Sequence, residues 1–373
     1  MYDVAVVGAG PAGAAAALAA LRSRPGARVL LLDRHDFPRD KCCGDGVAPH
    51  ALDELARLGV ADVLADRAAI GGMRLVSPRG VEASHPLARP DYVIPRVLFD
   101  ARLTAAAVAR GAELVRHTVR RLDIRADHVV LDGTFAARVV VGADGANGVV
   151  RRQLGVPRQD PATVAVAVRG YVPFETATPE QVIVMDGRDW PAYAWRFDGG
   201  DGVANVGFGM LLPSLQAAGH GKSLLEERMV ELLPEAAGAT MLRSHHLPLS
   251  TGRPRQPAGR VLLAGDAASL VNPLTGEGIY YALLSGRLAG AAAVGAGDPG
   301  LAYRSMLSRE LGTHLRHTTL ISSVTAHPRV LEGGVRAAKA SVETMDALVE
   351  MGLGRGKITG ALVRGLAREV LRR

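Results

Sequence analysis

Both cysteines of the chain lie side by side in the segment "DKCCGDGVAP", residues 40–49. Neighbouring cysteines rarely form a disulfide with each other because the geometry is strained. No third cysteine is present to complete a metal site, so Cys42 and Cys43 are predicted to be free thiols, as in a reducing compartment. The Gly-Asp-Gly sequence at residues 44–46 predicts a turn whose backbone approaches a ligand closely. Two small side chains packed in a crowded loop are the alternative.

The N-terminal residues have the spacing of a dinucleotide-binding motif. An apolar strand at residues 3–7 precedes glycines at positions 8, 10 and 13 and an alanine-rich helix. Gly8 allows a tight turn, Gly10 lets the backbone approach a pyrophosphate, and Gly13 lets helix and strand pack closely. A second apolar strand then ends in Asp33, at a spacing suited to a ribose-binding carboxylate. The order of these features predicts a dinucleotide site at a helix N-terminus.

Two later apolar strands also end in an aspartate. Residues 139–151 contain a strand followed by Asp144, and residues 260–268 contain a strand followed by Asp266. A polar, glycine-rich loop at residues 272–278 and a helix continue from the second strand. Aspartates at the carboxyl ends of parallel strands lie where such sheets bind their ligands. Each motif taken alone also fits an ordinary strand-to-helix loop.

Together these motifs resemble the two-domain flavoprotein family that includes aromatic hydroxylases, flavin-dependent halogenases and geranylgeranyl reductases. The resemblance covers residues 1 to about 300 and implies FAD as the cofactor. It implies that Asp266 binds the ribityl chain and that the loop from Pro273 to Gly278 lies against the isoalloxazine. The dipole of the following helix would then stabilise a reduced, anionic flavin. Arg96 matches an arginine that contacts FAD, and Asp144 matches a position near the pyrophosphate and the nicotinamide donor.

The resemblance also implies the fold and the site. It implies an α/β fold, in which a Rossmann-like FAD-binding domain carries an inserted, mainly antiparallel β-sheet domain for substrate, with a C-terminal helical tail. The expected FAD-binding domain comprises residues 1–70, 95–158 and 251–300, the sheet domain residues 71–94 and 159–250, and the helical region residues 301–373. The expected cofactor-binding residues are Gly8, Gly10, Ala12, Gly13, Asp33, Arg34, Cys43, Gly44, Arg96, Asp144, Gly145, Gly265, Asp266, Pro273, Gly276 and Gly278.

An aromatic hairpin indicates a branch within this family. Tyr193, Trp195 and Phe197 alternate along the chain, so they share one face of a strand. An ordinary core face is the alternative. Their spacing, with Val-Gly-x-Gly at residues 206–209, resembles the substrate-pocket signature of geranylgeranyl reductases. One departure is Asp198, which stands where that signature has proline, and it leaves the substrate wall open to question.

Resemblance to the same branch extends to the cysteine loop. The segment from Phe37 to Gly46 is similar to a family loop in which one cysteine lies near the flavin, and the match falls on Cys43. We therefore expect Cys43 to face the isoalloxazine and Cys42 to point into the domain. The catalytic candidates are Cys43, Tyr193, Trp195 and Phe197. Halogenases need a lysine between flavin and substrate, and none occurs from Cys42 to Gly221.

These observations predict an FAD-dependent oxidoreductase that reduces carbon–carbon double bonds of a prenyl-like or polyene lipid, with NAD(P)H as the reductant. No proton donor stands out in the sequence. Two alternatives stay open: a flavin monooxygenase acting on a biosynthetic intermediate, and a flavin-binding partner that only relays electrons. The pocket hairpin argues against the second alternative. No metal site is expected.

Composition limits the partners. The 373 residues are 48% hydrophobic and 22% charged, which indicates a soluble globular chain of about two domains. No stretch approaches the roughly 20 apolar residues of a membrane span, and the N-terminus lacks the basic region of a signal peptide, so a cytoplasmic protein is expected. The net charge of +7 fits anionic substrates, a membrane surface or a phosphorylated carrier, and equally a solvated surface rich in arginine. Few aromatics and no recognised motif disfavour nucleic acid.

The C-terminal tail and the histidines have less definite interpretations. Residues 361–373 place apolar side chains on one helical face and arginines elsewhere. Peripheral contact with a membrane, a cap on the sheet domain and a dimer contact are all compatible with this pattern. The histidines outside the motifs are predicted to be surface or helix-end residues rather than metal ligands: His245, His246, His314, His317 and His327.

Overall fold

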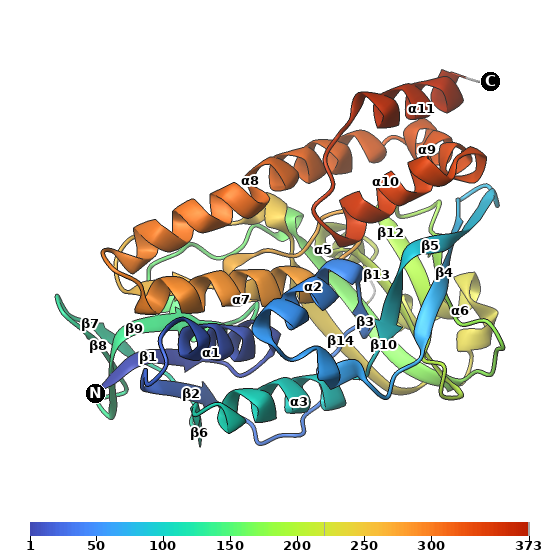
Figure 1. Ribbon diagram of the computed structural model, residues 1–373. Coiled ribbons are helices and arrows are strands. Elements are labelled where there is room, and N and C mark those ends of the chain that lie inside the picture. The colour runs from blue at the N-terminus through green and yellow to red at the C-terminus, as the bar shows by residue number, and fades with distance from the viewer. Residues whose placement is uncertain (220, 372–373) are drawn as a thin grey trace.

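Residues 1–219 and 221–371 are described by a computed structural model (Figure 1). They form two β-sheets that lie side by side, with long helices running over the first sheet and a group of C-terminal helices beside the second. The expected α/β class, with a Rossmann-like sheet, a mainly antiparallel sheet and C-terminal helices, is confirmed. In the described residues, no helix combines the length and the apolar character that a membrane span requires.

The first sheet carries the nucleotide motifs. Its strand order is β6-β2-β1-β9-β8-β7, with β15 also paired to β9. The strands are β1 (Tyr2–Val7), β2 (Val29–Asp33), β6 (Glu113–Arg116), β7 (Leu122–Ile124), β8 (Val129–Leu131), β9 (Phe135–Gly142) and β15 (Val261–Leu263). β6, β2, β1, β9 and β15 run parallel, so the residues after β1, β2, β9 and β15 meet at one edge. The near-continuous apolar sequence of β1 and β2 is typical of parallel strands buried on both faces.

Helices α1 (Pro11–Ser23) and α7 (Ile279–Val294) pack against each other on this sheet. Small residues make the close packing possible. A Cβ atom added at Gly286 would lie 2.1 Å from the carbonyl oxygen of Ala12, and one at Gly290 would lie 2.1 Å from that of Ala16. Both glycines therefore let the two backbones touch. Other helices of this region are α2 (Pro49–Leu58), α3 (Arg96–Ala109) and α4 (Val149–Gln153).

The second sheet has the strand order β14-β10-β13-β12-β11-β4-β5-β3. The strands are β3 (Gly46–Val47), β4 (Ala69–Val76), β5 (Glu82–Val93), β10 (Val164–Pro173), β11 (Glu180–Met185), β12 (Ala192–Asp198), β13 (Val203–Leu211) and β14 (Thr240–Pro248). Neighbouring strands are antiparallel except β11 and β4. β3 continues directly from the cysteine loop, which brings that loop to the edge of this sheet. Helices α5 (Leu212–Ala217) and α6 (Lys222–Leu232) follow β13.

The C-terminal helices are α8 (Pro299–Thr325), α9 (Pro328–Ala340), α10 (Val342–Leu353) and α11 (Gly360–Leu371). α8 runs beside α7, and α9 to α11 gather over β4 and β5 (Figure 1). Met73 and Leu75 of β4 share an apolar cluster with Val335 of α9 and Met345 of α10. The terminal helix α11 packs on α9. The described part of α11 also contacts α10, and Arg372 and Arg373 lie outside the described residues.

Candidate active site

A cavity of about 1110 Å³ lies between the two sheets, at the carboxyl ends of the parallel strands. Most of the residues expected in the site line it: Gly8, Gly10, Ala12, Asp33, Arg34, Cys43, Gly44, Arg96, Asp144, Gly145, Tyr193, Trp195, Phe197, Asp266, Pro273, Gly276 and Gly278. Gly13 and Gly265 lie behind the wall. A Cβ atom at Gly13 would lie 1.8 Å from the carbonyl oxygen of Gly8, so Gly13 supports the motif by packing. The fold thus gathers four separate sequence motifs around one space.

One end of the cavity is built for a nucleotide. Gly8 has φ +97°, and a Cβ atom there would lie 2.4 Å from the carbonyl oxygen of Ala143, so only glycine fits. The carboxylate of Asp33 accepts a hydrogen bond from the amide of Ala9 at 2.8 Å, which fixes the loop before α1. α1 begins at Pro11 without a side-chain cap, so the amides of its first turn point toward the cavity. Such a helix N-terminus binds phosphate oxygens.

Two arginines lie beside this phosphate cradle. Arg96, at the start of α3, is 4% exposed and forms a two-point ion pair with Asp100, with distances of 2.6 Å and 2.8 Å. Asp100 also pairs with Arg39 at 3.1 Å. Burial opposes the charge of Arg96, but Asp100 more than offsets it and raises the pKa of the guanidinium. Since a Cβ at Gly10 would lie 3.4 Å from Arg39 and 3.9 Å from Arg96, both cations face the loop expected to hold pyrophosphate.

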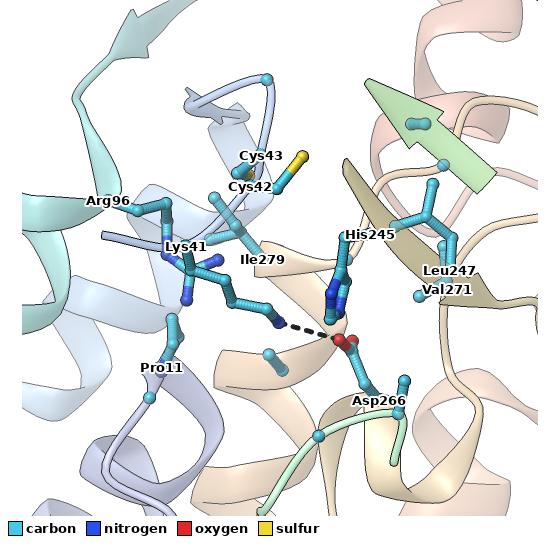
Figure 2. Close-up of a pocket in the computed structure, with 18 of the residues that line it drawn as sticks. Pro11, Lys41, Cys42, Cys43, Arg96, His245, Leu247, Asp266, Val271 and Ile279 are labelled. Carbon is cyan, nitrogen blue, oxygen red and sulfur yellow. Dashed lines mark hydrogen bonds and ion pairs between the residues drawn. The ribbon is translucent and has the colours of Figure 1, made fainter. Parts of the chain in front are cut away.

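The middle of the cavity holds a charged contact that the sequence did not predict. Lys41 donates to a carboxylate oxygen of Asp266 at 3.0 Å, and His245 of β14 lies next to the same carboxylate (Figure 2). Burial raises the pKa of Asp266, but Lys41 and His245 outweigh it and the pKa is lowered. Burial and the Lys41 charge lower the pKa of His245 to about 4, and its Nε2 atom has no hydrogen-bond partner among the described residues. A neutral imidazole with a free ring nitrogen therefore faces the expected ribityl position.

The two cysteines have different surroundings. The thiol of Cys42 donates to the carbonyl oxygen of Arg243 on β14 at 3.1 Å. The backbone carbonyl of Cys43 accepts a hydrogen bond from the side chain of Asn205, and its side chain packs against the core of the first sheet. Burial raises the pKa of Cys42 to about 12 and raises that of Cys43 as well. Both are therefore neutral thiols at neutral pH, and both line the cavity.

The aromatic residues of β12 form one wall of the cavity. The ring centroid of Trp195 lies 6.1 Å from that of Tyr193 and 6.3 Å from that of Phe197. The hydroxyl of Tyr193 donates to the carbonyl oxygen of Thr275, which ties the wall to the loop expected to hold the isoalloxazine. A Cβ atom at Gly44 would lie 3.0 Å from the Phe197 ring. The Gly-Asp-Gly turn and the aromatic wall thus face each other directly.

Asp198, the departure from the family signature, does not touch this wall. Strand alternation turns it to the opposite face of β12, where its carboxylate accepts hydrogen bonds from Arg196 at 2.9 Å and from the amide of Glu180 at 3.1 Å. It is 1% exposed and does not line the cavity. The replacement of proline therefore leaves the aromatic face intact.

Four acids in the cavity wall were not among the expected site residues: Asp40, Asp45, Asp91 and Glu277. Burial raises the pKa of Asp45 to about 6, although Tyr171 and Asn205 both donate to it. Burial raises the pKa of Glu277 to about 7, although its carboxylate accepts the amide of Tyr280 at the start of α7. Asp45 and Glu277 each lie between two glycines, which was a usable signal. Asp91 follows a proline in a strand whose sequence looks exposed, so the sequence gave no signal for it.

The expectation for two of the histidines was wrong. His245 lies in the cavity, and His314 is 1% exposed, where its ring nitrogens contact the hydroxyl of Tyr281 and the carbonyl of Gly356. Neither is a surface residue, because the tertiary fold covers both strand and helix. Lys41 and Lys222, which lie just outside the range from Cys42 to Gly221, both line the cavity. The ammonium group of Lys41 is held by Asp266.

Comparison with known proteins identifies the class. The family model of the FAD binding domain matches residues 1–284. Menaquinone reductase of Mycolicibacterium smegmatis is 33% identical over 374 residues, which cover 92% of this chain and 90% of that protein. Digeranylgeranylglycerophospholipid reductase 1 of Methanopyrus kandleri is 33% identical over 323 residues, covering 83% of this chain and 84% of that protein. The structure of a geranylgeranyl bacteriochlorophyll reductase-like protein from Thermoplasma acidophilum superposes with a TM-score of 0.81 at 20% identity and covers 99% of this chain and 96% of that one.

The fold and the site thus define an FAD-dependent oxidoreductase with the FAD binding domain. Within that class, the chain belongs to the geranylgeranyl reductase family. The cavity fits this cofactor on its own geometry. The uncapped amides of α1 and the cations Arg39 and Arg96 suit the pyrophosphate, and the unpartnered ring nitrogen of His245 beside Asp266 suits a hydroxylated chain.

Proposed function

We propose that this enzyme reduces a carbon–carbon double bond in a prenyl-like or polyene substrate, with a nicotinamide donor as the source of electrons. The observation that carries the proposal is the aromatic wall of β12, which is bonded through Tyr193 to the loop expected to hold the isoalloxazine. The aromatic side chains of this wall suit a hydrocarbon chain. The names of the curated relatives, which are reductases of isoprenoid lipids and quinones, support the same substrate class.

The residues assigned to FAD follow from the cavity. Arg96 and the amides of α1 would hold the pyrophosphate, Asp33 a ribose, Asp266 the ribityl chain, and the loop from Pro273 to Gly278 the isoalloxazine. When bound and reduced, FAD supplies a hydride, while the protein excludes water and orients the substrate. Glu277 caps α7, so the helix dipole is partly neutralised there whenever that carboxyl is ionised.

FAD binding at this place predicts a defined effect of Asp266→Ala. The substitution removes a charged hydrogen-bonding group and leaves the Lys41 ammonium without its partner. We expect the Kd for FAD, measured by fluorescence titration of apoprotein, to rise about 10- to 100-fold, since hydrogen bonds to charged groups contribute about 1.5–3 kcal/mol. Unchanged affinity would remove Asp266 from the site.

Anaerobic turnover tests the reaction. Chemically reduced enzyme under nitrogen is mixed with digeranylgeranylglycerophospholipid or with menaquinone, and the products are examined by mass spectrometry. Addition of two hydrogens without oxygen supports the proposal. Product that forms only when oxygen is admitted, and that carries labelled oxygen, identifies a monooxygenase. Flavin that is reduced by NADH or NADPH but reduces neither lipid favours an electron-relay role.

Peripheral contact with a membrane is part of the same proposal. Leu320 and Val324, one turn apart on α8, are 56% and 48% exposed. Arg253, Arg255 and Arg316 line a surface pocket of about 460 Å³ together with Thr319 of the same helix. Apolar side chains beside arginines suit the boundary of an anionic bilayer. Sedimentation with phosphatidylglycerol vesicles and, separately, with phosphatidylcholine vesicles tests the contact. If the protein binds neither kind of vesicle, membrane contact is excluded.

A further inference from the structure

Asp91 is a buried carboxyl group with no ion pair among the described residues, and the side-chain amide of Gln181 on β11 is the one donor that acts on it. It lies on β5, opposite Ile70 of β4, two residues before the strand position that pairs with Gly46. Its exposed fraction is 0%, and it forms part of the cavity wall. Neither carboxyl oxygen has a hydrogen-bond partner among the described residues. A buried, unpartnered carboxylate is costly, so an acid in this place indicates a role other than stability.

Burial and one neighbouring carboxyl group together favour the neutral form of Asp91. Glu277 faces it from the loop before α7, Arg89 lies on its own strand, and the amide of Gln181 lies nearby on β11. Burial and the Glu277 charge raise the pKa of Asp91 to about 8, against weaker opposing effects of Gln181 and Arg89. Arg89 is itself committed to Asp53 through two hydrogen bonds of 2.7 Å and 3.1 Å. Because the charge of Glu277 raises the pKa of Asp91, the two carboxyls disfavour being ionised together, and Asp91 keeps its proton at neutral pH.

The position of Asp91 places this proton at the substrate side of the cavity. A Cβ atom at Gly46 would lie 3.6 Å from the side-chain amide nitrogen of Gln181 and 3.7 Å from the Phe197 ring. Gln181 and Phe197 are paired residues on β11 and β12. The carboxyl therefore belongs to the part of the wall where the aromatic strand meets the Gly-Asp-Gly turn. That is the region where the proposed function requires the double bond.

Other groups in the wall are less suited to give up a proton. The hydroxyl of Tyr193 already donates to Thr275, and burial raises its pKa above the ordinary value. The thiol of Cys42 donates to Arg243 and has its pKa raised to about 12. Asp45 accepts hydrogen bonds from Tyr171 and Asn205, which hold it as an acceptor. Asp91 is the acid of this set with the fewest partners, since only the side-chain amide of Gln181 acts on it as a donor.

Reduction of a double bond adds a hydride to one carbon and a proton to the other. The bound, reduced flavin accounts for the hydride, with its two electrons, and the proton has to come from an acid or from water. We propose that Asp91 is this acid: its O–H bond breaks, the proton adds to the second carbon, and the electron pair stays on the carboxylate. Solvent then returns a proton to Asp91, so the cycle balances. This inference rests on the proposed function and assigns the proton donor that the sequence left open.

The test compares Asp91→Asn and Asp91→Glu with wild type, with Asp186→Asn as the matched control. Asp186 is also a buried aspartate of this sheet region, 2% exposed, but it does not line the cavity. In anaerobic single turnovers of reduced enzyme with the lipid that wild type reduces, we expect oxidation of the flavin by the lipid to slow about 10²- to 10⁴-fold in Asp91→Asn. Asp91→Glu should recover part of the rate, and Asp186→Asn should match wild type. FAD affinity should be unchanged in all three variants.

The pH profile and infrared spectra separate a proton donor from a packing role. The wild-type rate of lipid reduction should fall as pH rises through about 8, where Asp91 loses its proton, and this step should be absent in Asp91→Asn. Independently of turnover, difference infrared spectra of wild type minus Asp91→Asn should show a protonated carboxyl at pH 7 that disappears above that pH. A lipid-reduction rate and pH profile that are the same in Asp91→Asn and wild type, or a carboxyl already ionised at pH 6, would overturn the inference. Wild-type enzyme that reduces neither lipid would instead overturn the proposed function, and the donor role with it.

Discussion

Single residues of the cysteine loop have distinguishable roles, although they are neighbours. Cys42 is bonded to the backbone of β14, so it links the loop to the second sheet. Cys43 lies between the expected flavin position and the core, and its neutral thiol is a poor acid at neutral pH. A polarisable side chain beside the flavin therefore remains our prediction for Cys43, and a structural contact for Cys42.

Cys43→Ala should change the turnover rate or the product pattern with FAD still bound. Cys42→Ala should instead lower the free energy of unfolding by about 1 kcal/mol, because the hydrogen bond from its thiol to Arg243 is lost. Urea unfolding and steady-state assays of the two variants measure both effects. Equal and small changes in turnover for the two variants would show that the pair only fills space.

Asp91 also predicts a pH dependence of stability. Because its pKa is raised from 3.8 to about 8 in the folded state, its contribution to stability is complete below about pH 4 and is lost as pH rises through about 8. Asp91→Asn removes this loss, so the variant should match wild type near pH 4 and exceed it by several kcal/mol, at most about 6 kcal/mol, above pH 8, because each pKa unit is worth about 1.4 kcal/mol. Urea unfolding across this range provides the measurement, and a pH-independent difference would contradict the assignment.

At the scale of elements, β12 and β13 build the aromatic wall as a unit. Trp195 of β12 is 6% exposed, and its indole nitrogen donates to the side chain of Asn205 on β13 at 2.9 Å. Gly207 lies opposite Trp195 in the register, and the ring covers the place where a side chain would be. A Cβ atom at Gly207 would lie 2.1 Å from the ring. The wall therefore depends on a glycine in the neighbouring strand.

Gly207→Ala should push the Trp195 ring out of its place and lower the free energy of unfolding by about 1–3 kcal/mol, as overpacking does. Gly209→Ala in the same strand is the matched control, since its Cβ would make an ordinary contact of 3.4 Å with Ala167. Thermal unfolding and tryptophan fluorescence follow both changes. If the two variants were equally stable, the ring would not be packed on Gly207.

At the scale of the whole molecule, the C-terminal helices hold the loop expected to carry the isoalloxazine. The side chain of Asn272 donates to the carbonyl oxygen of Met351 at 3.0 Å, and that of Thr275 donates to Gly352 at 2.6 Å. Leu353 reaches the cavity wall. α10 is thus part of the site, although it is far from the nucleotide motifs in the sequence.

Two truncations separate these contributions. Removal of residues 359–373 deletes α11 and should lower the melting temperature while leaving FAD affinity within about twofold, because the contacts to Met351 and Gly352 stay. Removal of residues 341–373 also deletes α10, and FAD affinity should then fall by about tenfold or more, as two hydrogen bonds to the loop are lost. Melting curves and FAD titration compare the two. Equal FAD affinity in both truncations would exclude a role for α10 in the site.

The sequence by itself determined the nucleotide-binding half and the α/β class. Gly8, Gly10 and Asp33 follow local rules, since a tight turn, a helix N-terminus and a strand end are specified by residues that are close along the chain. Asp144 and Asp266 could be found in the same way because each ends an apolar strand. The face shared by Tyr193, Trp195 and Phe197 follows from strand alternation, which is also local.

Only the tertiary structure decided which side chains meet across the cavity. Lys41 and Asp266 are separated by more than 200 positions in the chain, and no periodicity links them. His245 was expected at the surface and Asp91 was not singled out, but the fold places both in the cavity wall, and α9 and α10 pack on the strand of Asp91. Burial and the pKa of an acid depend on all neighbours at once, so the chemistry of Asp91 could not be read from the chain order. The cofactor half of the site is thus specified locally, and its acid–base half by packing.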